Sequence, residues 1–158
     1  MGGRLFVIAA LAGAVPFIAS AQSWTNWERQ NSVTKSGDWM VIKQPGAGFC
    51  YLKQSYNDQT GKMELSMKAD YHPFVPLPFY RGLDGDVIYR VDDGALRIIP
   101  QNRARNPLLL SKEIVPELKS GSVLTIRVKP VGRTPIEQRF SLRGFTAATA
   151  WLNKPVCN

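Results

Sequence analysis

The stretch KMELSMKAD, residues 62–70, decides the fold class, because apolar and polar residues alternate along its whole length. A period of two places successive side chains on opposite faces of a β-strand. One face of this strand carries Met63, Leu65, Met67 and Ala69, and the other carries charged residues and a serine. The pattern predicts a strand with one face in a core and the other turned toward solvent.

The same alternation recurs further along the chain, in Ser122–Lys129 and Ile136–Leu142. Other strands are predicted at residues 39–43, 49–53, 87–91 and 95–99. Between the last two runs, Asp92-Asp93-Gly94 contains an Asp-Gly pair, which is typical of a hairpin turn. Short strands separated by turn signals predict a mainly β fold, an antiparallel β-sandwich or a barrel-like domain.

Two short helices are predicted as well, one of them at the C-terminus. Ser111 is placed to cap a helical turn over Lys112–Leu118, which Pro116 is expected to interrupt. Phe145–Leu152 is rich in alanine and brings its apolar residues to neighbouring helical positions. The proline-rich segment Tyr71–Phe79 is predicted to be extended or an edge segment, since sheets confine proline to such positions.

The N-terminus has the three parts of a secretory signal peptide. Arg4 supplies a positive charge, Leu5–Ile18 is an uncharged apolar run, and Ala19-Ser20-Ala21 matches the small-x-small cleavage pattern. A membrane anchor is the alternative, but an anchor needs about 20 apolar residues, and this run is shorter. We therefore expect cleavage between Ala21 and Gln22.

Removal of the signal, residues 1–21, leaves two parts. Residues 22–37 are predicted to form an N-terminal arm, and residues 38–158 a single β-rich domain. Later hydrophobic runs are interrupted by charge or proline, so we expect no transmembrane segment after signal removal. The signal predicts a location in the periplasm, outside the cell or at the surface of a bacterium.

Cys50 and Cys157 are the only cysteines of the chain. An even number of cysteines in an exported protein favours a disulfide, because the compartment is oxidising. A catalytic dithiol is the alternative, but such pairs are close in sequence, as in C-x-x-C. We therefore predict a structural disulfide between Cys50 and Cys157.

The chain carries a formal net charge of +8, and removal of Arg4 with the signal leaves +7 (8 − 1). A basic surface attracts anionic material such as lipopolysaccharide, anionic lipid or acidic glycans. We expect an unknown protein or an anionic envelope component as partner; a solvated basic face that aids solubility is the simplest alternative. Nucleic acid is not expected, because the densest basic group, Arg97, Arg103 and Arg105, lacks interleaved aromatic residues.

No constellation of catalytic residues stands out in the sequence. His72 is the only histidine, and a turn or surface histidine is its simplest interpretation. Asp84-Gly85-Asp86 and Asp92-Asp93 do not have the spacing of a calcium loop. Two cysteines and one histidine do not complete a zinc site. We therefore expect no catalytic residue, no metal, no cofactor and no enzymatic activity.

Aromatic residues are the remaining candidates for binding. Phe74, Phe79 and Tyr80 form a possible binding loop for a sugar or a peptide. Aromatic residues are more often part of the core, however. Three others are assigned to the core: Trp39, Phe140 and Trp151.

The segment FSLRGFTAA, residues 140–148, resembles the final strand, glycine turn and helix of the invasion-associated locus B family of small exported bacterial proteins. Trp39 followed by Cys50 is similar to the opening tryptophan and cysteine region of that family. Pro76-Leu77-Pro78 followed by Asp84–Asp93 resembles its central passage from prolines to a hairpin.

The chain also departs from the family pattern. Family members commonly carry additional cysteines, including a pair in the middle of the domain, whereas Ile99–Leu110 contains none here. The resemblance implies a periplasmic or surface-associated β-rich domain, linked in some bacteria to host-cell invasion. It implies no established enzymatic activity and no active-site residues.

Three functional hypotheses follow from the sequence. The first is a non-enzymatic, exported binding protein of the invasion-associated type. The second is an inhibitor or immunity-like protein that blocks a foreign enzyme with a protruding loop, Tyr71–Tyr80. The third is a hydrolase that uses two of the carboxylates Asp84, Asp86 and Asp92, which would have to converge in a cleft.

Overall fold

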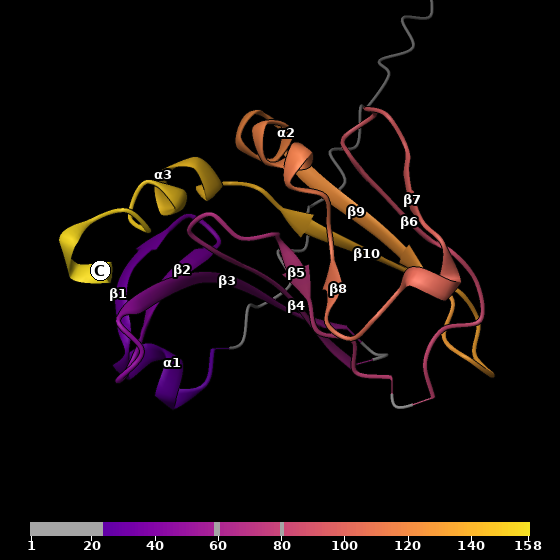
Figure 1. Cartoon of the computed structure of the whole chain (residues 1–158), viewed down its shortest axis with the longest axis horizontal. Helices are drawn as coiled ribbons and strands as arrows, with labels where there is room; N and C mark the ends of the chain where they lie inside the picture. The colour runs from indigo at the N-terminus through magenta and orange to yellow at the C-terminus, as the bar shows by residue number, and fades with distance from the viewer. Residues whose placement is uncertain (1–23, 59–60, 80) are drawn as a thin grey trace, which may run out of the picture.

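The computed structural model describes residues 24–58, 61–79 and 81–158. Within these ranges the chain forms two antiparallel sheets, of six and four strands, that share one hydrophobic core (Figure 1). The predicted signal peptide, its cleavage site at Ala21 and Gln22, and Tyr80 lie outside the described residues.

The larger sheet has the strand order β1-β2-β3-β4-β5-β8, so sequential strands pair along most of it. Its strands are β1 (Ser32–Ser36), β2 (Trp39–Gln44), β3 (Phe49–Asp58), β4 (Gly61–Lys68), β5 (Phe74–Val75) and β8 (Leu108–Leu109). The smaller sheet has the order β10-β9-β6-β7. Its strands are β6 (Val87–Val91), β7 (Arg97–Ile99), β9 (Val123–Val128) and β10 (Ile136–Ser141). The predicted mainly β, antiparallel fold is confirmed, and two sheets around one core correspond to its sandwich form.

The stretch that predicts the fold class forms β4, an inner strand of the larger sheet. Met63, Leu65 and Met67 point into the core, as the alternation predicts. Ser66 on the opposite face is also buried. It lies between Lys53 of β3 and Phe74 of β5 in the strand register, and these two larger side chains flank it.

Trp39 of β2 packs in the core against the C-terminal part of the chain. Trp39 is fully buried, and its ring meets that of Phe145 edge to face at a centroid distance of 4.9 Å. The indole N–H of Trp39 donates a hydrogen bond to the Ser141 carbonyl at 3.2 Å. Phe140 is fully buried as predicted, and Trp151 is partly buried against the core.

The helices are short. Their bounds are α1 (Asn26–Gln30), α2 (Val115–Ser120), α3 (Phe145–Thr149), and the 3-10 turns η1 (Gln101–Arg103), η2 (Lys112–Ile114) and η3 (Pro155–Cys157). The Ser111 hydroxyl accepts a hydrogen bond from the Glu113 N–H at 3.2 Å, so the predicted cap is present. Pro116 does not interrupt the helix as expected, because it lies in the first turn of α2, where no N–H is needed. No helix in the described ranges is both long and apolar enough to cross a bilayer.

The described part of the predicted arm belongs to the folded domain, because α1 precedes β1 and β1 forms an edge of the larger sheet. A capping box begins α1. The Glu28 N–H donates to the Thr25 hydroxyl at 3.1 Å, and the Thr25 N–H donates to the Glu28 carboxylate at 2.6 Å. The T-x-x-E spacing of residues 25–28 is the sequence signal for such a helix start.

An ion pair between Glu28 and Lys53 fastens α1 to β3, and Lys53 also pairs with Glu64 at 2.6 Å. Burial by itself raises the pKa of Glu28, but hydrogen bonds from Lys53 and Thr25 outweigh it and hold the pKa below its ordinary 4.5. Burial by itself lowers the pKa of Lys53, but hydrogen bonds to Glu28 and Glu64 outweigh it and raise the pKa above 10.5.

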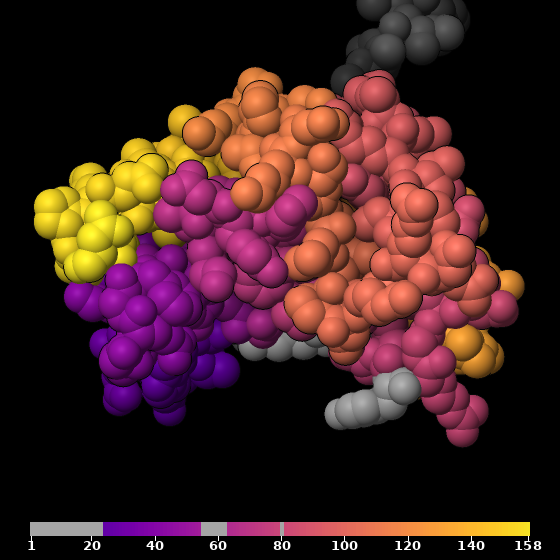
Figure 2. Space-filling model, viewed as in Figure 1, coloured from indigo at the N-terminus to yellow at the C-terminus, as the bar shows by residue number. Residues whose placement is uncertain are grey.

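The two ends of the domain lie against each other (Figure 2, yellow on indigo). The predicted disulfide joins Cys50 of β3 to Cys157, across a sequence separation of 107. Both cysteines are buried. The bond therefore ties the last residues of the chain to the larger sheet.

Two glycines make the close approach of the ends possible. Gly37 and Gly144 both have left-handed backbones, with φ of +56° and +89°. A Cβ atom on Gly144 would lie 2.2 Å from the Ser36 carbonyl oxygen, so only glycine fits. Next to them, the Asp38 N–H donates to the Arg143 carbonyl at 3.0 Å, and their side chains form an ion pair at 2.6 Å.

Candidate functional site

The structure divides the predicted binding loop. Phe74 belongs to β5, where it is paired with Ser66 and Leu109, and its ring contacts Tyr71. Phe79 instead lines a pocket at the other end of the loop. Phe74 is not part of that pocket wall, so the two phenylalanines do not form one platform.

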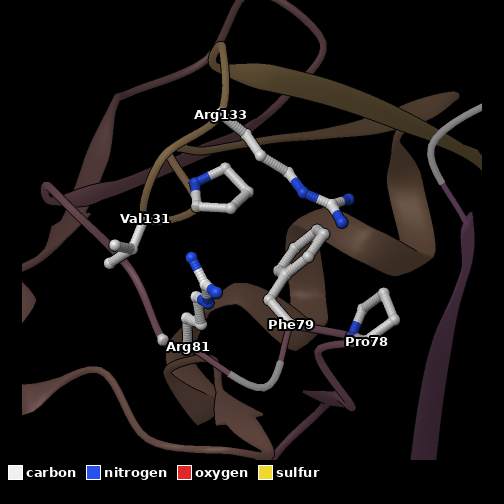
Figure 3. Close-up of a pocket in the computed structure, with 7 residues that line it drawn as sticks. Pro78, Phe79, Arg81, Val131 and Arg133 are labelled. Atoms are coloured by element: carbon white, nitrogen blue, oxygen red, sulfur yellow. The ribbon is translucent and has the colours of Figure 1, made fainter.

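The pocket has a volume of about 180 Å³ and lies between two loops (Figure 3). One loop follows β5, and the other is the turn that joins β9 to β10. Its wall consists of Pro78, Phe79, Arg81, Gly82, Pro130, Val131 and Arg133. A pocket of this size is smaller than the ~300–1,000 Å³ of typical small-molecule sites, so it fits a small ligand or a side chain.

Backbone contacts hold the two loops together. Leu83 and Pro130 form an isolated antiparallel bridge, and the Asp84 N–H donates to the Lys129 carbonyl at 2.7 Å. The Lys129 ammonium also pairs with the Asp84 carboxylate at 3.1 Å. These contacts fix one loop relative to the other, so the pocket is built into the fold.

Gly132 shapes the β9–β10 turn. The Arg133 N–H donates to the Pro130 carbonyl at 3.1 Å, and Gly132 has φ of +71°. A positive φ at the third position of such a turn favours glycine. No atom lies within 4 Å of a Cβ built on Gly132, so the backbone conformation alone selects glycine here.

The segment that precedes Phe79 is anchored in the core. Val75 and Leu77 are buried in the core. The Asn106 side chain brackets Leu77, accepting from its N–H at 3.0 Å and donating to its carbonyl at 3.0 Å. Pro78 and Phe79 therefore start from a fixed position.

Arg81 and Arg133 distinguish this pocket chemically. Both are exposed, and no hydrogen bond or ion pair joins either guanidinium to another described residue. Figure 3 shows the two guanidinium groups on either side of the Phe79 ring. Guanidinium groups bind carboxylates and phosphates bidentately. The pocket thus offers an anion two groups of hydrogen-bond donors beside an apolar ring.

The aspartates considered for catalysis have structural partners. Asp86 accepts from the Gln101 N–H at 2.9 Å, and Asp92 accepts from the N–H groups of Ser122 and Val123, both at 2.9 Å. Asp86 and Asp92 flank β6, and at ~3.3 Å per residue they are separated by roughly 20 Å. Paired glycosidase carboxylates lie about 5 to 9.5 Å apart. These two aspartates do not converge.

His72 and the other possible metal ligands among the described residues are not arranged as a site. The His72 ring Nδ1 lies 2.8 Å from the Leu110 carbonyl oxygen. In residues 24–58, 61–79 and 81–158, no group of three or more His, Cys, Asp or Glu side chains is arranged to hold a metal ion. No sequence pattern marks the pocket arginines, because their isolation depends on which residues surround them in space.

No protein-family model matches the chain, and no curated protein does either. A solved structure does: the crystal structure of invasion associated protein B from Bartonella henselae. The two structures superpose with a TM-score of 0.56 over 75% of this chain and 94% of that chain, at 19% sequence identity.

The chain shares the fold of invasion associated protein B. The predicted resemblance is therefore confirmed as a distant structural match. At 19% identity the match describes the fold and transfers no site residue.

Proposed function

We propose that this chain is an exported, non-enzymatic binding protein of the invasion-associated type that acts in the bacterial periplasm or cell envelope. Three features support the proposal. The fold is similar to that of invasion associated protein B. The N-terminus has the pattern of a secretory signal. The Cys50–Cys157 disulfide is compatible with an oxidising compartment.

The pocket around Phe79 is the proposed binding site, and the observation that carries it is the pair of guanidinium groups, of Arg81 and Arg133, that no other described residue engages. Arg143 is also exposed, but Asp38 engages its guanidinium group. Arg81 and Arg133 instead face an apolar ring. The ligand class is an anionic group, a carboxylate or phosphate, attached to an apolar or aromatic portion.

Binding rather than catalysis fits the composition of the wall. Proline, phenylalanine, glycine, valine and arginine side chains supply no group that titrates near neutral pH. General acid–base catalysis depends on such a group. An inhibitor that acts through a protruding loop is less favoured, because Val75 and Leu77 anchor that loop in the core.

Export is tested by expressing the full chain in a Gram-negative host. We expect the protein in the periplasmic fraction, with a mass reduced by residues 1–21 and with no thiol open to alkylation before reduction. A full-length, reduced protein confined to the cytoplasm would contradict the proposal.

The pocket is tested by titrating the purified protein with phenyl phosphate and inorganic phosphate. We expect phenyl phosphate to bind more tightly, because its ring contacts Phe79. The double variant Arg81→Gln/Arg133→Gln should weaken phenyl phosphate binding about tenfold or more, since charged hydrogen bonds contribute roughly 1.5–3 kcal/mol each. The matched control Arg103→Gln/Arg105→Gln removes the same charge outside the pocket and should bind as the wild type does. Equal losses in both variants would exclude the pocket.

A further inference from the structure

The four-stranded sheet, β10-β9-β6-β7, lies beside the larger sheet (Figure 1), and its outer face differs from its inner face in burial. The inner face is buried along each of β6, β9 and β10. Between these buried positions, the strands present arginines on the outside: Arg90 on β6, Arg127 on β9 and Arg139 on β10. Three adjacent strands thus each contribute one arginine to the same face.

The strand register brings these arginines close together. Thr125 is paired with Arg139 on one side and with Arg90 on the other. Arg127 lies two residues from Thr125 on the same face, so it is a diagonal neighbour of both. Diagonal neighbours in antiparallel sheets are ~7–8 Å apart. The three positive charges therefore surround one threonine.

Little in the described chain neutralises this cluster. Arg90 approaches Asp93 only at 3.9 Å, and the Asp93 side chain is fully exposed. Glu137 is paired with Arg127 in the register, but no ion pair within 4.0 Å joins them among the described residues. The diagonal arginines repel one another, since like charges at this separation interact unfavourably. Such a cluster is better explained by an anionic partner than by folding.

Two isoleucines, half-buried Ile88 and exposed Ile98, adjoin the arginines on the same face. Ile88 is paired with Arg127 on one side and with Ile98 on the other. Ile98, on the edge strand β7, is 60% exposed. A flat face that combines arginines with an exposed isoleucine suits the boundary between lipid headgroups and acyl chains, where phosphates meet apolar material.

We propose that this face, defined by Arg90, Arg127, Arg139 and Ile98, docks onto a membrane surface with anionic phosphate headgroups. The three guanidinium groups bind lipid phosphates, and Ile98 enters the headgroup boundary. Single-stranded nucleic acid is less suited, because no aromatic residue stands at the outer positions of β6, β7, β9 or β10 to stack on bases. This face is separate from the Phe79 pocket. The inference rests on one part of the proposed function, export, because an exported chain encounters membrane surfaces.

The proposal is tested by co-sedimenting purified protein with vesicles of phosphatidylglycerol and phosphatidylcholine, and with vesicles of phosphatidylcholine alone. We expect binding to the mixed vesicles only. Arg127→Gln/Arg139→Gln should lower the partition coefficient roughly 30-fold, from about 1 kcal/mol per arginine near an anionic surface. Arg103→Gln/Arg105→Gln, with the same net charge, should bind far more like the wild type.

Two further variants decide between membrane docking and its rivals. Ile98→Ser should weaken vesicle binding at unchanged charge. Arg127→Lys/Arg139→Lys keeps the positive charges and should retain most of the vesicle binding. It thereby shows that the loss in the double glutamine variant comes from charge and not from misfolding. Equal losses in both glutamine variants would overturn the proposal, because net charge alone would explain binding. Vesicle binding that is unchanged in the Ile98→Ser variant would also overturn it. Binding would then depend on charge alone, as it would for an anionic polymer. Phenyl phosphate binding by the pocket is measured separately, so either proposal can fail alone.

Discussion

The junction of the chain ends and the pocket loops both use arginine and glycine, but the surroundings of these residues differ. At the junction, Arg143 pairs with Asp38, and Gly144 meets the backbone beside Gly37 without space for another atom. At the pocket, Arg81 has no described partner, and Gly132 has open space around it. The junction is built to hold the sandwich together. The pocket keeps its charges available.

This difference predicts how the two regions respond to substitution. Substitutions at the junction remove contacts that the native state needs, so they should lower the free energy of unfolding. Substitutions at the pocket arginines remove exposed side chains that make no hydrogen bond or ion pair to a described residue, so they should alter binding and leave unfolding nearly unchanged. The variants below test that contrast, in order of decreasing effect on stability.

The largest loss is expected from opening the disulfide in Cys50→Ala/Cys157→Ala. A crosslink spanning 107 positions restricts the unfolded chain strongly, and the chain-entropy model gives about 4–5 kcal/mol for a loop of this length. Urea unfolding of wild type and variant measures the loss. A change below about 1 kcal/mol would contradict an anchoring role for the C-terminal residues, given the 2–5 kcal/mol usual for native disulfides.

The second loss is expected from Gly144→Ala. Its Cβ would lie 2.2 Å from the Ser36 carbonyl oxygen, and its φ is +89°. Steric displacement and backbone strain together should cost about 3 kcal/mol. The matched variant Gly132→Ala has the strain without the clash, so about 1 kcal/mol is expected. Equal midpoints of thermal unfolding for the two alanine variants would show that the close approach at the junction is unimportant.

A smaller loss is expected from Glu28→Gln, which keeps the capping box because glutamine serves there as glutamate does. The charge that faces Lys53 disappears, and when the amide oxygen accepts from the Thr25 N–H, an NH2 group replaces the oxygen that accepts from Lys53. Losing a charged hydrogen bond partner should cost about 1.5 kcal/mol at neutral pH.

The pH dependence separates this charge effect from a packing defect. Because the pKa of Glu28 is lowered on folding, its stabilisation is present above pH 4.5 and is lost as the pH falls through the folded-state pKa. Because the pKa of Lys53 is raised, its stabilisation is lost as the pH rises above 10.5. Unfolding curves of wild type and Glu28→Gln should therefore converge below pH 4.5. A constant difference at all pH values would argue against the ion pair.

The fold was predictable where local pattern dominates. Alternation placed β4, β9 and β10, and the Asp-Gly pair placed the β6–β7 hairpin. Strands β1 and β8 were missed, because β1 is mostly polar and β8 has two residues, so neither carries a period. α1 was missed although its T-x-x-E signal is present.

The candidate site was predictable only in part. Phe79 was singled out as an aromatic residue beside prolines, and it lines the pocket. Arg81 and Arg133 line the same pocket but lie far apart from each other in sequence. The Leu83–Pro130 bridge brings their two loops together. Register between distant loops leaves no local trace in the sequence. Likewise, the disulfide was predictable from a count of two cysteines, whereas the close approach of Gly37 and Gly144 was not.

The smallest effect on stability is expected from Arg81→Gln/Arg133→Gln, within about 0.5 kcal/mol of the wild type, as for surface substitutions without partners. Arg143→Gln provides the contrast, since it removes an exposed guanidinium that Asp38 engages at 2.6 Å. Thermal unfolding of the three proteins ranks them. If the pocket variant unfolds at a lower temperature than Arg143→Gln, the pocket arginines support the loops, and their lack of described partners does not reflect a binding role. If it unfolds with the wild type while losing phenyl phosphate, stability and recognition reside in different arginines of one small domain.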